Sequence, residues 1–187
     1  KMNVNLIAVD EAHCISQWGY DFRPAYLRIA RMREILPGVP VLALTASATD
    51  SVAQDIMEKL RFREPHVIRS DYARPNLSFS VRCTDDRKGQ LMRILDRVPG
   101  SGIVYVRTRD AAELLAAELK EEGVFAEYYH AGLPHGERAL RQNDWTSGKT
   151  RVMVATNAFG MGIDKPDVRF VVHYGLGASL EEYYQEA

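Results

Sequence analysis

Hydrophobic residues gather in short runs that are apolar throughout. These runs lie at residues 6–9, 39–44, 103–106, 152–155 and 170–173, and Pro40 interrupts the second. Because none alternates between apolar and polar residues, each run predicts a strand buried on both faces, as in a parallel sheet covered by helices. Their β-branched residues favour strand over helix, although the periodicity of so short a run leaves both open.

Amphipathic stretches of helical length separate these runs. Ser51 with Gln54 resembles a capping box, and Asp110 can cap a later helix. The expected helices run between Pro24 and Pro37, from Ser51 through Leu60, from Asp110 to Gly123, and between Pro134 and Gly148. This alternation of strands and helices predicts an α/β fold of parallel sheets covered by helices, with right-handed crossovers.

A polar stretch at residues 70–76 interrupts the alternation and contains an Arg74–Pro75 step. We expect a domain boundary there, which gives one domain at residues 1–72 and a second at residues 73–187. The first is hardly long enough for a complete doubly wound domain, whereas the second could be one.

Polar side chains follow each apolar run. Open parallel sheets bind ligands beyond the carboxyl ends of their strands, so these side chains predict a functional site. The first run leads into Asp10, Glu11 and His13, the second into Thr45, Ser47 and Thr49, the third into Arg107 and Arg109, and the fourth into residues 156–164.

The adjacent carboxylates Asp10 and Glu11 could divide the work of nucleotide hydrolysis. One can hold Mg²⁺ through water, because that ion dehydrates reluctantly, while the other orients and deprotonates an attacking water. This is the Walker B arrangement of nucleotide hydrolases. Taken alone, an acidic pair before a helix is more often just a helix start.

An aromatic cluster follows the acidic pair. Trp18, Tyr20, Phe22 and Tyr26 lie close together and are interleaved with Arg23. Such a loop suits stacking on the bases of a single strand, worth about 1–3 kcal/mol per base. Packing into the core is the alternative; we favour packing for Tyr26 and base contact for Trp18 and Phe22.

Composition narrows the class of protein. With 46% hydrophobic residues in 187, the chain is not disordered, and no apolar run reaches the roughly 20 residues of a membrane span. A net charge of −1 excludes a globally basic nucleic-acid binder, although residues 20–33 are locally basic. Cys14 and Cys83 form neither a disulfide framework nor a metal knuckle, so we expect a reducing, cytoplasmic setting.

Residues 147–150 read Ser-Gly-Lys-Thr and have the ending of a P-loop, but Asn143 stands where the phosphate cradle needs glycine. The segment also precedes a strand, whereas a P-loop follows one. We therefore reject a P-loop here.

Several ordered segments resemble the motifs of the RecQ family of ATP-dependent DNA helicases. Two departures are Ser47, where threonine is usual, and an additional Arg107 to which we assign no role. The resembling segments are the DEAH box with its aromatic-rich loop at residues 10–26, motif III at 44–49, motif IV at 103–109, a strand exit at 130–133, motif V at 154–173 and the opening of motif VI at 183–186.

The resemblance implies RecA-like (P-loop NTPase) lobes, the first of them truncated, with ATP and Mg²⁺ as cofactors. Asp10 would hold Mg²⁺ through water, Glu11 would be the base for the water that attacks the γ-phosphate, and His13 would couple hydrolysis to movement. Nucleotide contacts are also implied for Gly162 and Asp164, and nucleic-acid contacts for Trp18, Phe22, Arg23, Ser47, Thr49 and Thr156.

The resemblance further implies a parent that moves 3′ to 5′ on single-stranded DNA and unwinds partly duplex DNA in repair or recombination. Such a parent would be cytoplasmic, nucleoid-associated in a bacterium, and without membrane contact; which proteins it binds is unknown from the sequence. In the family a P-loop precedes the acidic box and paired arginines continue motif VI. We therefore expect residues 1–187 to be cut inside the motor at both ends and to be inactive alone.

Other functions stay open beside this one. An RNA-directed DExH helicase shares most of these motifs, although the aromatic-rich loop argues against it. A non-catalytic nucleic-acid-binding module could keep the scaffold without the phosphate site, and an upstream P-loop would exclude it. A purely structural domain is made remote by the ordered motifs.

Overall fold

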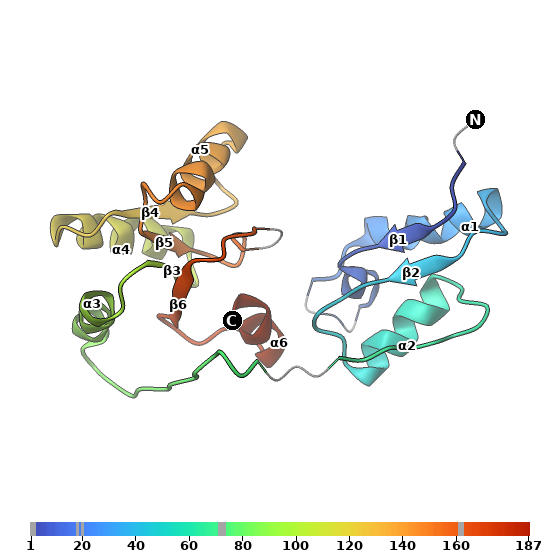
Figure 1. Cartoon of the computed structure of the whole chain (residues 1–187), viewed down its shortest axis with the longest axis horizontal. Coiled ribbons are helices and arrows are strands. Elements are labelled where there is room, and N and C mark those ends of the chain that lie inside the picture. Colours follow the sequence, from blue (N-terminus) through green and yellow to red (C-terminus); the bar gives the residue numbers. More distant parts are fainter. Residues whose placement is uncertain (1–2, 18, 20, 71–73, 161–162) are drawn as a thin grey trace. The chain divides into compact units, whose positions relative to one another are not determined.

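The structure, a computed structural model, describes residues 3–17, 19, 21–70, 74–160 and 163–187. The chain forms two compact units, Lys1–Ser78 and Phe79–Ala187, which Figure 1 colours from blue to green and from green to red. The units meet a few residues after the boundary expected between residues 72 and 73.

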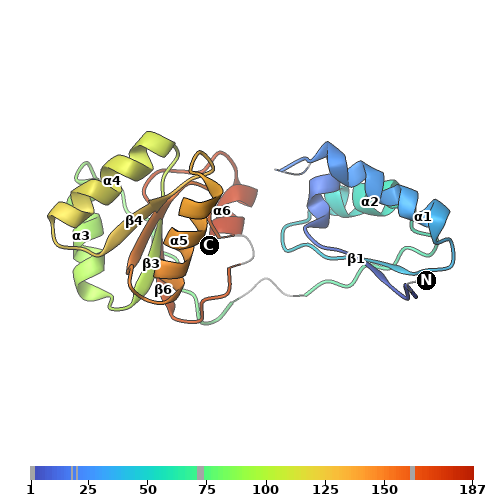
Figure 2. The same cartoon turned by 90° about the horizontal axis from the view of Figure 1, so that it is seen from above.

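The first unit contains a two-stranded parallel sheet of β1 (Ile7–Val9) and β2 (Val41–Ala43), in which Ile7 lies opposite Val41. Helices connect and follow the strands (Figure 2). They are the 3-10 helices η1 (Ala12–Ile15) and η2 (Pro24–Arg31), the short α1 (Met32–Ile35), and α2 (Asp50–Lys59) after β2.

The core of this unit lies between η1, β1 and α2. The face of α2 that the sequence predicts does pack inward, since Val52 and Ile56 and the following Leu60 are buried against Val9 and Ile15. We expected these strands to be buried on both faces, and this prediction is wrong, because Leu42 in β2 is 43% exposed. The reason is that the described part of this unit holds a sheet of only two strands.

The second unit contains a four-stranded parallel sheet with the strand order β4-β5-β3-β6. Its strands are β3 (Ser101–Tyr105), β4 (Ala126–Tyr129), β5 (Val152–Ala155) and β6 (Val168–His173). Its helices are α3 (Arg87–Arg97), α4 (Arg109–Glu121), α5 (His135–Thr146) and α6 (Leu180–Glu186).

Two apolar clusters cover this sheet. Every residue of β3 and β5 is buried, as the wholly apolar runs predict. On one face the leucines of α3 and α4, such as Leu91 and Leu115, pack against Val104. In the other cluster Trp145 of α5 packs with Met153. The structure therefore confirms the predicted α/β fold of a parallel sheet covered by helices.

Two predicted helix caps are wrong by two residues. Thr49, not Ser51, caps α2 and accepts a hydrogen bond from the Val52 amide at 3.4 Å. Thr108, not Asp110, caps α4 in the same way. A cap residue must have extended backbone before the first helical turn, and Ser51 and Asp110 already lie within that turn.

The helix ends at glycine are confirmed. Gly123 and Gly148 follow α4 and α5 with φ of 80° and 83°, the left-handed region that glycine enters without a Cβ penalty. Among the described residues, no helix is both long enough and apolar enough to cross a membrane.

Candidate functional site

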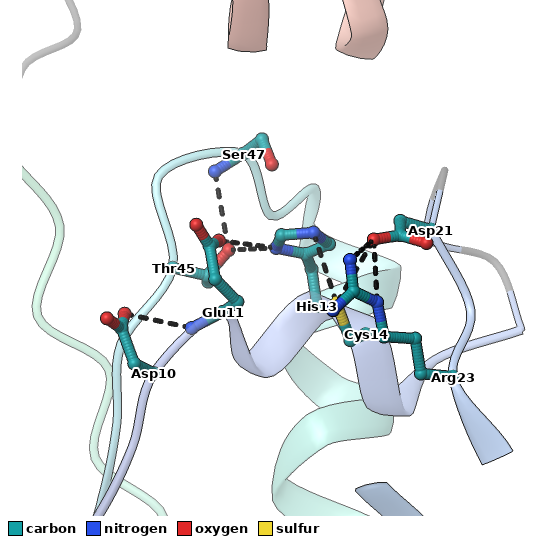
Figure 3. A network of polar contacts seen from close by, with 8 residues as sticks. All are labelled: Asp10, Glu11, His13, Cys14, Asp21, Arg23, Thr45 and Ser47. Carbon is teal, nitrogen blue, oxygen red and sulfur yellow. Dashed lines mark hydrogen bonds and ion pairs between the residues drawn. The ribbon is translucent and has the colours of Figure 1, made fainter. Parts of the chain in front are cut away.

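The acidic pair and the predicted motif III meet at one edge of the first unit. Asp10 and Glu11 directly follow β1, while Thr45 and Ser47 follow β2. Because the two strands are parallel and in register, their carboxyl ends bring these four residues together, as Figure 3 shows. The Ala12 amide donates to the Leu44 carbonyl at 2.9 Å and ties the two loops to each other.

Glu11 has a left-handed backbone, with φ of 48°. Such a conformation costs a non-glycine residue about 1–2 kcal/mol and persists only where the surroundings enforce it. Here the Asp10 carboxylate accepts a hydrogen bond from the Glu11 amide at 2.9 Å. The side chain of Glu11 is 32% exposed and Asp10 is exposed, so both carboxylates can reach a ligand.

His13 lies in η1 and is buried. Its Nδ1 is 3.0 Å from Thr45 Oγ1 and 3.4 Å from Glu11 Oε2. Burial lowers the pKa of His13 below its usual value, and this outweighs the opposing effect of the Glu11 carboxylate. A neutral imidazole therefore joins the acidic pair to the residues that follow β2.

Three further residues surround the other side of the imidazole. His13 Nε2 lies 3.6 Å from Cys14 Sγ, and the Cys14 thiol donates to Asp21 Oδ2 at 3.8 Å. The same Asp21 oxygen accepts a hydrogen bond from Arg23 Nε at 2.9 Å. The sequence interpretation missed Asp21, because only the folded loop brings it next to His13. The sequence also led us to expect that both cysteines are buried thiols; this is confirmed for Cys14 and wrong for Cys83, which is exposed.

The predicted nucleic-acid residues of this unit are placed unevenly. Phe22 is half-buried and Arg23 is exposed, so both can meet a ligand. Tyr26 packs against the core, as favoured from the sequence. Trp18 lies outside the described residues.

The hydroxyls after β2 differ in their surroundings. Ser47 Oγ is buried and has no hydrogen-bond partner among the described residues. Thr49 Oγ1 already serves as the cap of α2 and contacts Ser51 Oγ at 3.0 Å. Ser47 is therefore the freer of the two for a ligand.

A second set of site residues lies at the carboxyl ends of the strands in the second unit. A pocket there is lined by Tyr105 at the end of β3, Arg107 after β3, Thr156 and Asn157 after β5, and residues of α6. The Arg107 guanidinium donates to the Leu176 carbonyl. Thr156 therefore stands where the sequence places it, while the exposed Asp164 is not part of the pocket lining and Gly162 lies outside the described residues.

The loop after β5 rests on a buried tyrosine. Tyr105 Oη donates to the Phe159 carbonyl at 2.9 Å, and burial raises the pKa of this phenol. The neighbouring Gly160 has φ of 119°, and a Cβ there would lie 2.6 Å from Tyr105 Oη. Glycine is thus required at this position by both its backbone and its neighbour.

Other polar contacts hold the elements of the pocket. His173 Nε2 lies 3.1 Å from Glu186 Oε2, and its ring stacks on Tyr105 at 5.6 Å between centroids. The sequence did not reveal this pair. His130 Nε2 lies 2.9 Å from the carboxylate of Glu113.

Residues 87–187 match the family model of the helicase conserved C-terminal domain. The chain belongs to this helicase family. The match includes all helices and strands of the second unit, from α3 to α6.

Curated relatives agree over nearly the whole chain. It is 44% identical over 183 residues to the ATP-dependent DNA helicase hus2/rqh1 of Schizosaccharomyces pombe, an alignment that covers 96% of the chain and 14% of that helicase. It is also 44% identical to the ATP-dependent DNA helicase RecQ of Pasteurella multocida, over 98% of the chain and 29% of the relative. These relatives confirm the resemblance to RecQ-type helicases, and the chain spans less than a third of the length of either.

A solved structure shows the same fold. Dbp5 of S. cerevisiae, in a structure with RNA and ADP BeF3, matches with a TM-score of 0.71 and 23% identity over 99% of the chain and 50% of that protein. Together with the family match, this likeness confirms that the chain carries the RecA-like helicase fold that the motifs imply.

Proposed function

We propose that this chain is part of an ATP-dependent 3′-5′ DNA helicase of RecQ type. The observation that carries the proposal is the site at the ends of β1 and β2, where the paired carboxylates Asp10 and Glu11 are joined to Thr45 through a buried neutral His13. The names of the RecQ-type relatives support the same activity. The parent would translocate on single-stranded DNA, unwind partly duplex DNA, and act in repair or recombination in the cytoplasm or nucleoid.

The exposed Asp10 carboxylate fits a magnesium ion held through water. No cluster of three His, Cys, Asp or Glu side chains that could hold a metal directly occurs among residues 3–17, 19, 21–70, 74–160 and 163–187. Mg²⁺ usually keeps several waters and binds through one or two carboxylates and the substrate phosphates. When bound, the ion would neutralise charge on the phosphates of ATP.

Glu11 is the proposed general base. The left-handed backbone of Glu11 and the hydrogen bond from its amide to the Asp10 carboxylate hold the backbone from which its side chain extends. His13 Nδ1 lies 3.4 Å from the Glu11 carboxylate. A carboxylate held in this way can orient water and take its proton. His13 is proposed to transmit the state of this site to the rest of the unit.

The remaining predicted contacts stay proposals of the same kind. Phe22 and Trp18 would stack on bases, Arg23 would bind a phosphate, and Thr156 would bind the nucleic-acid backbone. Ser47 and Thr49 would also contact nucleic acid, while Gly162 and Asp164 would contact the nucleotide. Residues 1–187 alone would hydrolyse little ATP, because their sequence contains no P-loop motif.

The test is Glu11→Gln in the full-length helicase that contains these residues. The amide keeps the size of the side chain but cannot take a proton, so we expect ATP binding to persist and hydrolysis to slow by about 10²–10⁴-fold. Glu34→Gln is the matched control, because Glu34 is exposed and paired with Arg61 away from the site. Turnover close to normal in Glu11→Gln would contradict the assignment of the base.

The same preparation separates the two nucleic acids. Stimulation of ATP hydrolysis by single-stranded DNA well above that by RNA supports the DNA helicase, and the reverse supports an RNA-directed enzyme. Hydrolysis that responds to neither would favour a module that only binds.

A further inference from the structure

Lys165, in the connection between β5 and β6, has a buried side chain. Only 4% of the side chain is exposed. Lysine is almost never buried to this degree, because a buried charge costs free energy unless it is paired and hydrogen-bonded. The surroundings of Lys165 must therefore compensate its charge.

Three partners surround the Lys165 ammonium, as many as it has N–H groups. It pairs with Asp167 Oδ1 at 2.8 Å, donates to the Thr146 carbonyl at 3.2 Å, and lies over the ring of Trp145 at 5.3 Å from the centroid. Thr146 is the last residue of α5, where a carbonyl has no partner within the helix and a positive charge is stabilised. An ion pair, a helix end and an aromatic ring therefore hold the ammonium together.

These partners are themselves fixed to β3. Trp145 is buried and donates through Nε1 to the Gly102 carbonyl at 3.2 Å. Asp167 accepts a hydrogen bond from the hydroxyl of Ser101, the first residue of β3, at 3.5 Å. The hydrogen bond from Lys165 also lowers the pKa of Asp167 below its usual value, so this carboxylate is charged at neutral pH. Lys165 is thereby fastened to both α5 and β3.

The backbone around Lys165 determines the side on which Asp164 lies. Lys165 precedes Pro166, and a residue before proline is restricted to extended backbone. Successive side chains of extended backbone point to opposite sides. Ile163 packs against the apolar cluster that contains Trp145, and the side chain of Lys165 is buried. Asp164, between these two inward residues, is exposed.

We propose that Lys165 is a positioning residue that sets the affinity for nucleotide by fixing the backbone from which Asp164 extends. The inference rests on the proposed function, in which Asp164 contacts the nucleotide. Without the ammonium, residues 163–167 lose their bonds to α5, and Asp164 adopts several positions. Ordering Asp164 then takes free energy from binding, so the nucleotide binds more weakly. The rate of hydrolysis stays, because Lys165 acts through a binding contact.

The experiment measures kcat and the KM for ATP of the full-length helicase with a saturating single-stranded oligothymidylate. Lys165→Met keeps an unbranched side chain that can pack on Trp145 but removes the ammonium. We expect it to raise the KM for ATP about tenfold and to leave kcat within about threefold of the unaltered protein, as loss of a binding contact does. Asp164→Ala should have the same effect.

The double variant tests whether Lys165 acts through Asp164. If it does, Lys165→Met should raise the KM no further in an Asp164→Ala background, because both changes remove one contact. Lys149→Met is the matched control, because Lys149 is a lysine of the same unit whose side chain is 75% exposed and pairs with Asp144. Its KM and kcat should equal those of the unaltered protein.

A second variant decides if Lys165→Met does not fold. Asp167→Asn removes the charge that pairs with the ammonium but keeps the shape of a side chain that is 54% exposed. The KM for ATP should then rise by about threefold, less than in Lys165→Met, because the Thr146 carbonyl still holds the ammonium. In the Asp164→Ala background Asp167→Asn should leave the KM unchanged.

Each outcome separates the positioning role from the helicase activity itself. An unchanged KM in Lys165→Met or in Asp164→Ala overturns the inference, as does a fall of kcat at constant KM. An equal rise of KM in both backgrounds also overturns it, because a merely structural lysine would give that result. Absence of ATP hydrolysis in the unaltered full-length protein contradicts the proposed function instead, and the inference falls with it.

Discussion

Replacing Gly160 by alanine tests how the loop after β5 is held in place. The backbone of Gly160, with φ of 119°, lies in a region that L side chains rarely adopt, and its Cβ would lie 2.6 Å from the hydroxyl of Tyr105. That hydroxyl donates to the buried Phe159 carbonyl at 2.9 Å, so it cannot move away without losing the bond. The substitution therefore adds backbone strain and breaks a buried hydrogen bond.

The two effects have separate magnitudes. Strain in a sparsely populated backbone region costs about 1–3 kcal/mol, and leaving a buried polar group unpaired costs about 1–3 kcal/mol. We expect Gly160→Ala to lower the free energy of unfolding of the second unit by about 2–6 kcal/mol in total, the sum of the two costs. The midpoint of urea unfolding should fall with little change in its slope.

The fluorescence of Trp145 is a suitable signal. Trp145 is buried and stacks edge-on against Phe159 at 5.2 Å between ring centroids, so it reports directly on this loop. Trp18→Phe in all variants removes the other tryptophan of the chain. The measurement then follows the second unit alone.

Two glycines serve as graded controls. Gly136 in α5 has nothing within 4 Å of an added Cβ, so Gly136→Ala should stabilise by about 0.4–1 kcal/mol. Gly148 has positive φ but open space, so Gly148→Ala should show only the backbone cost, about 1–2 kcal/mol. In a Tyr105→Phe background the Gly160→Ala penalty should approach the Gly148 value. An equal penalty in both backgrounds, or one no larger than that of Gly148→Ala, would refute this explanation.

Two further predictions concern the buried groups of the first unit. Because burial keeps the pKa of folded His13 below the 6.5 of the unfolded chain, unfolded protein binds the proton first, and the free energy of unfolding should fall as pH drops below about 6.5. Urea unfolding between pH 5 and pH 7 measures how the free energy of unfolding changes with pH. This dependence should be weaker in His13→Gln and unchanged in the control His66→Gln, which alters an exposed histidine. An unchanged dependence in His13→Gln would contradict the prediction. A thiol reagent at pH 8 should modify Cys83 rapidly and Cys14 only after unfolding, because Cys14 is 1% exposed and its pKa is raised to about 11. Loss of the fast phase in Cys83→Ala checks the assignment, and rapid labelling of Cys14 in that variant would contradict it.

The hydrophobic pattern predicted five of the strands because those runs are apolar from end to end. It missed β4, whose sequence Ala-Glu-Tyr-Tyr mixes apolar and polar residues. The physical reason is that β4 lies at an edge of the sheet, where it pairs with β5 alone. Its middle residues, Glu127 and Tyr128, are therefore only half-buried. An edge strand needs no continuous apolar run. The caps failed for a different reason, since Thr49 and Ser51 are both good cap residues and only backbone angles choose between them.

The sequence could place the candidate residues at the carboxyl ends of strands, because polar residues directly follow the apolar runs, as Asp10 and Glu11 follow β1. The contacts that join them could not be predicted. Thr45 reaches His13 across 32 positions of the sequence, and His173 meets Glu186 only after α6 folds back. Such pairs depend on how loops close in space, and local patterns carry no signal for that.

The left-handed backbone of Glu11 has a consequence for anyone who evolves this protein in the laboratory. Glycine and asparagine adopt that conformation more cheaply than glutamate does. A library screened only for survival on heating would therefore enrich those two residues at position 11 and discard the carboxylate. Under the proposed role of Glu11 as the base, the survivors would be more stable but inactive, so each round of such a screen must also select for turnover.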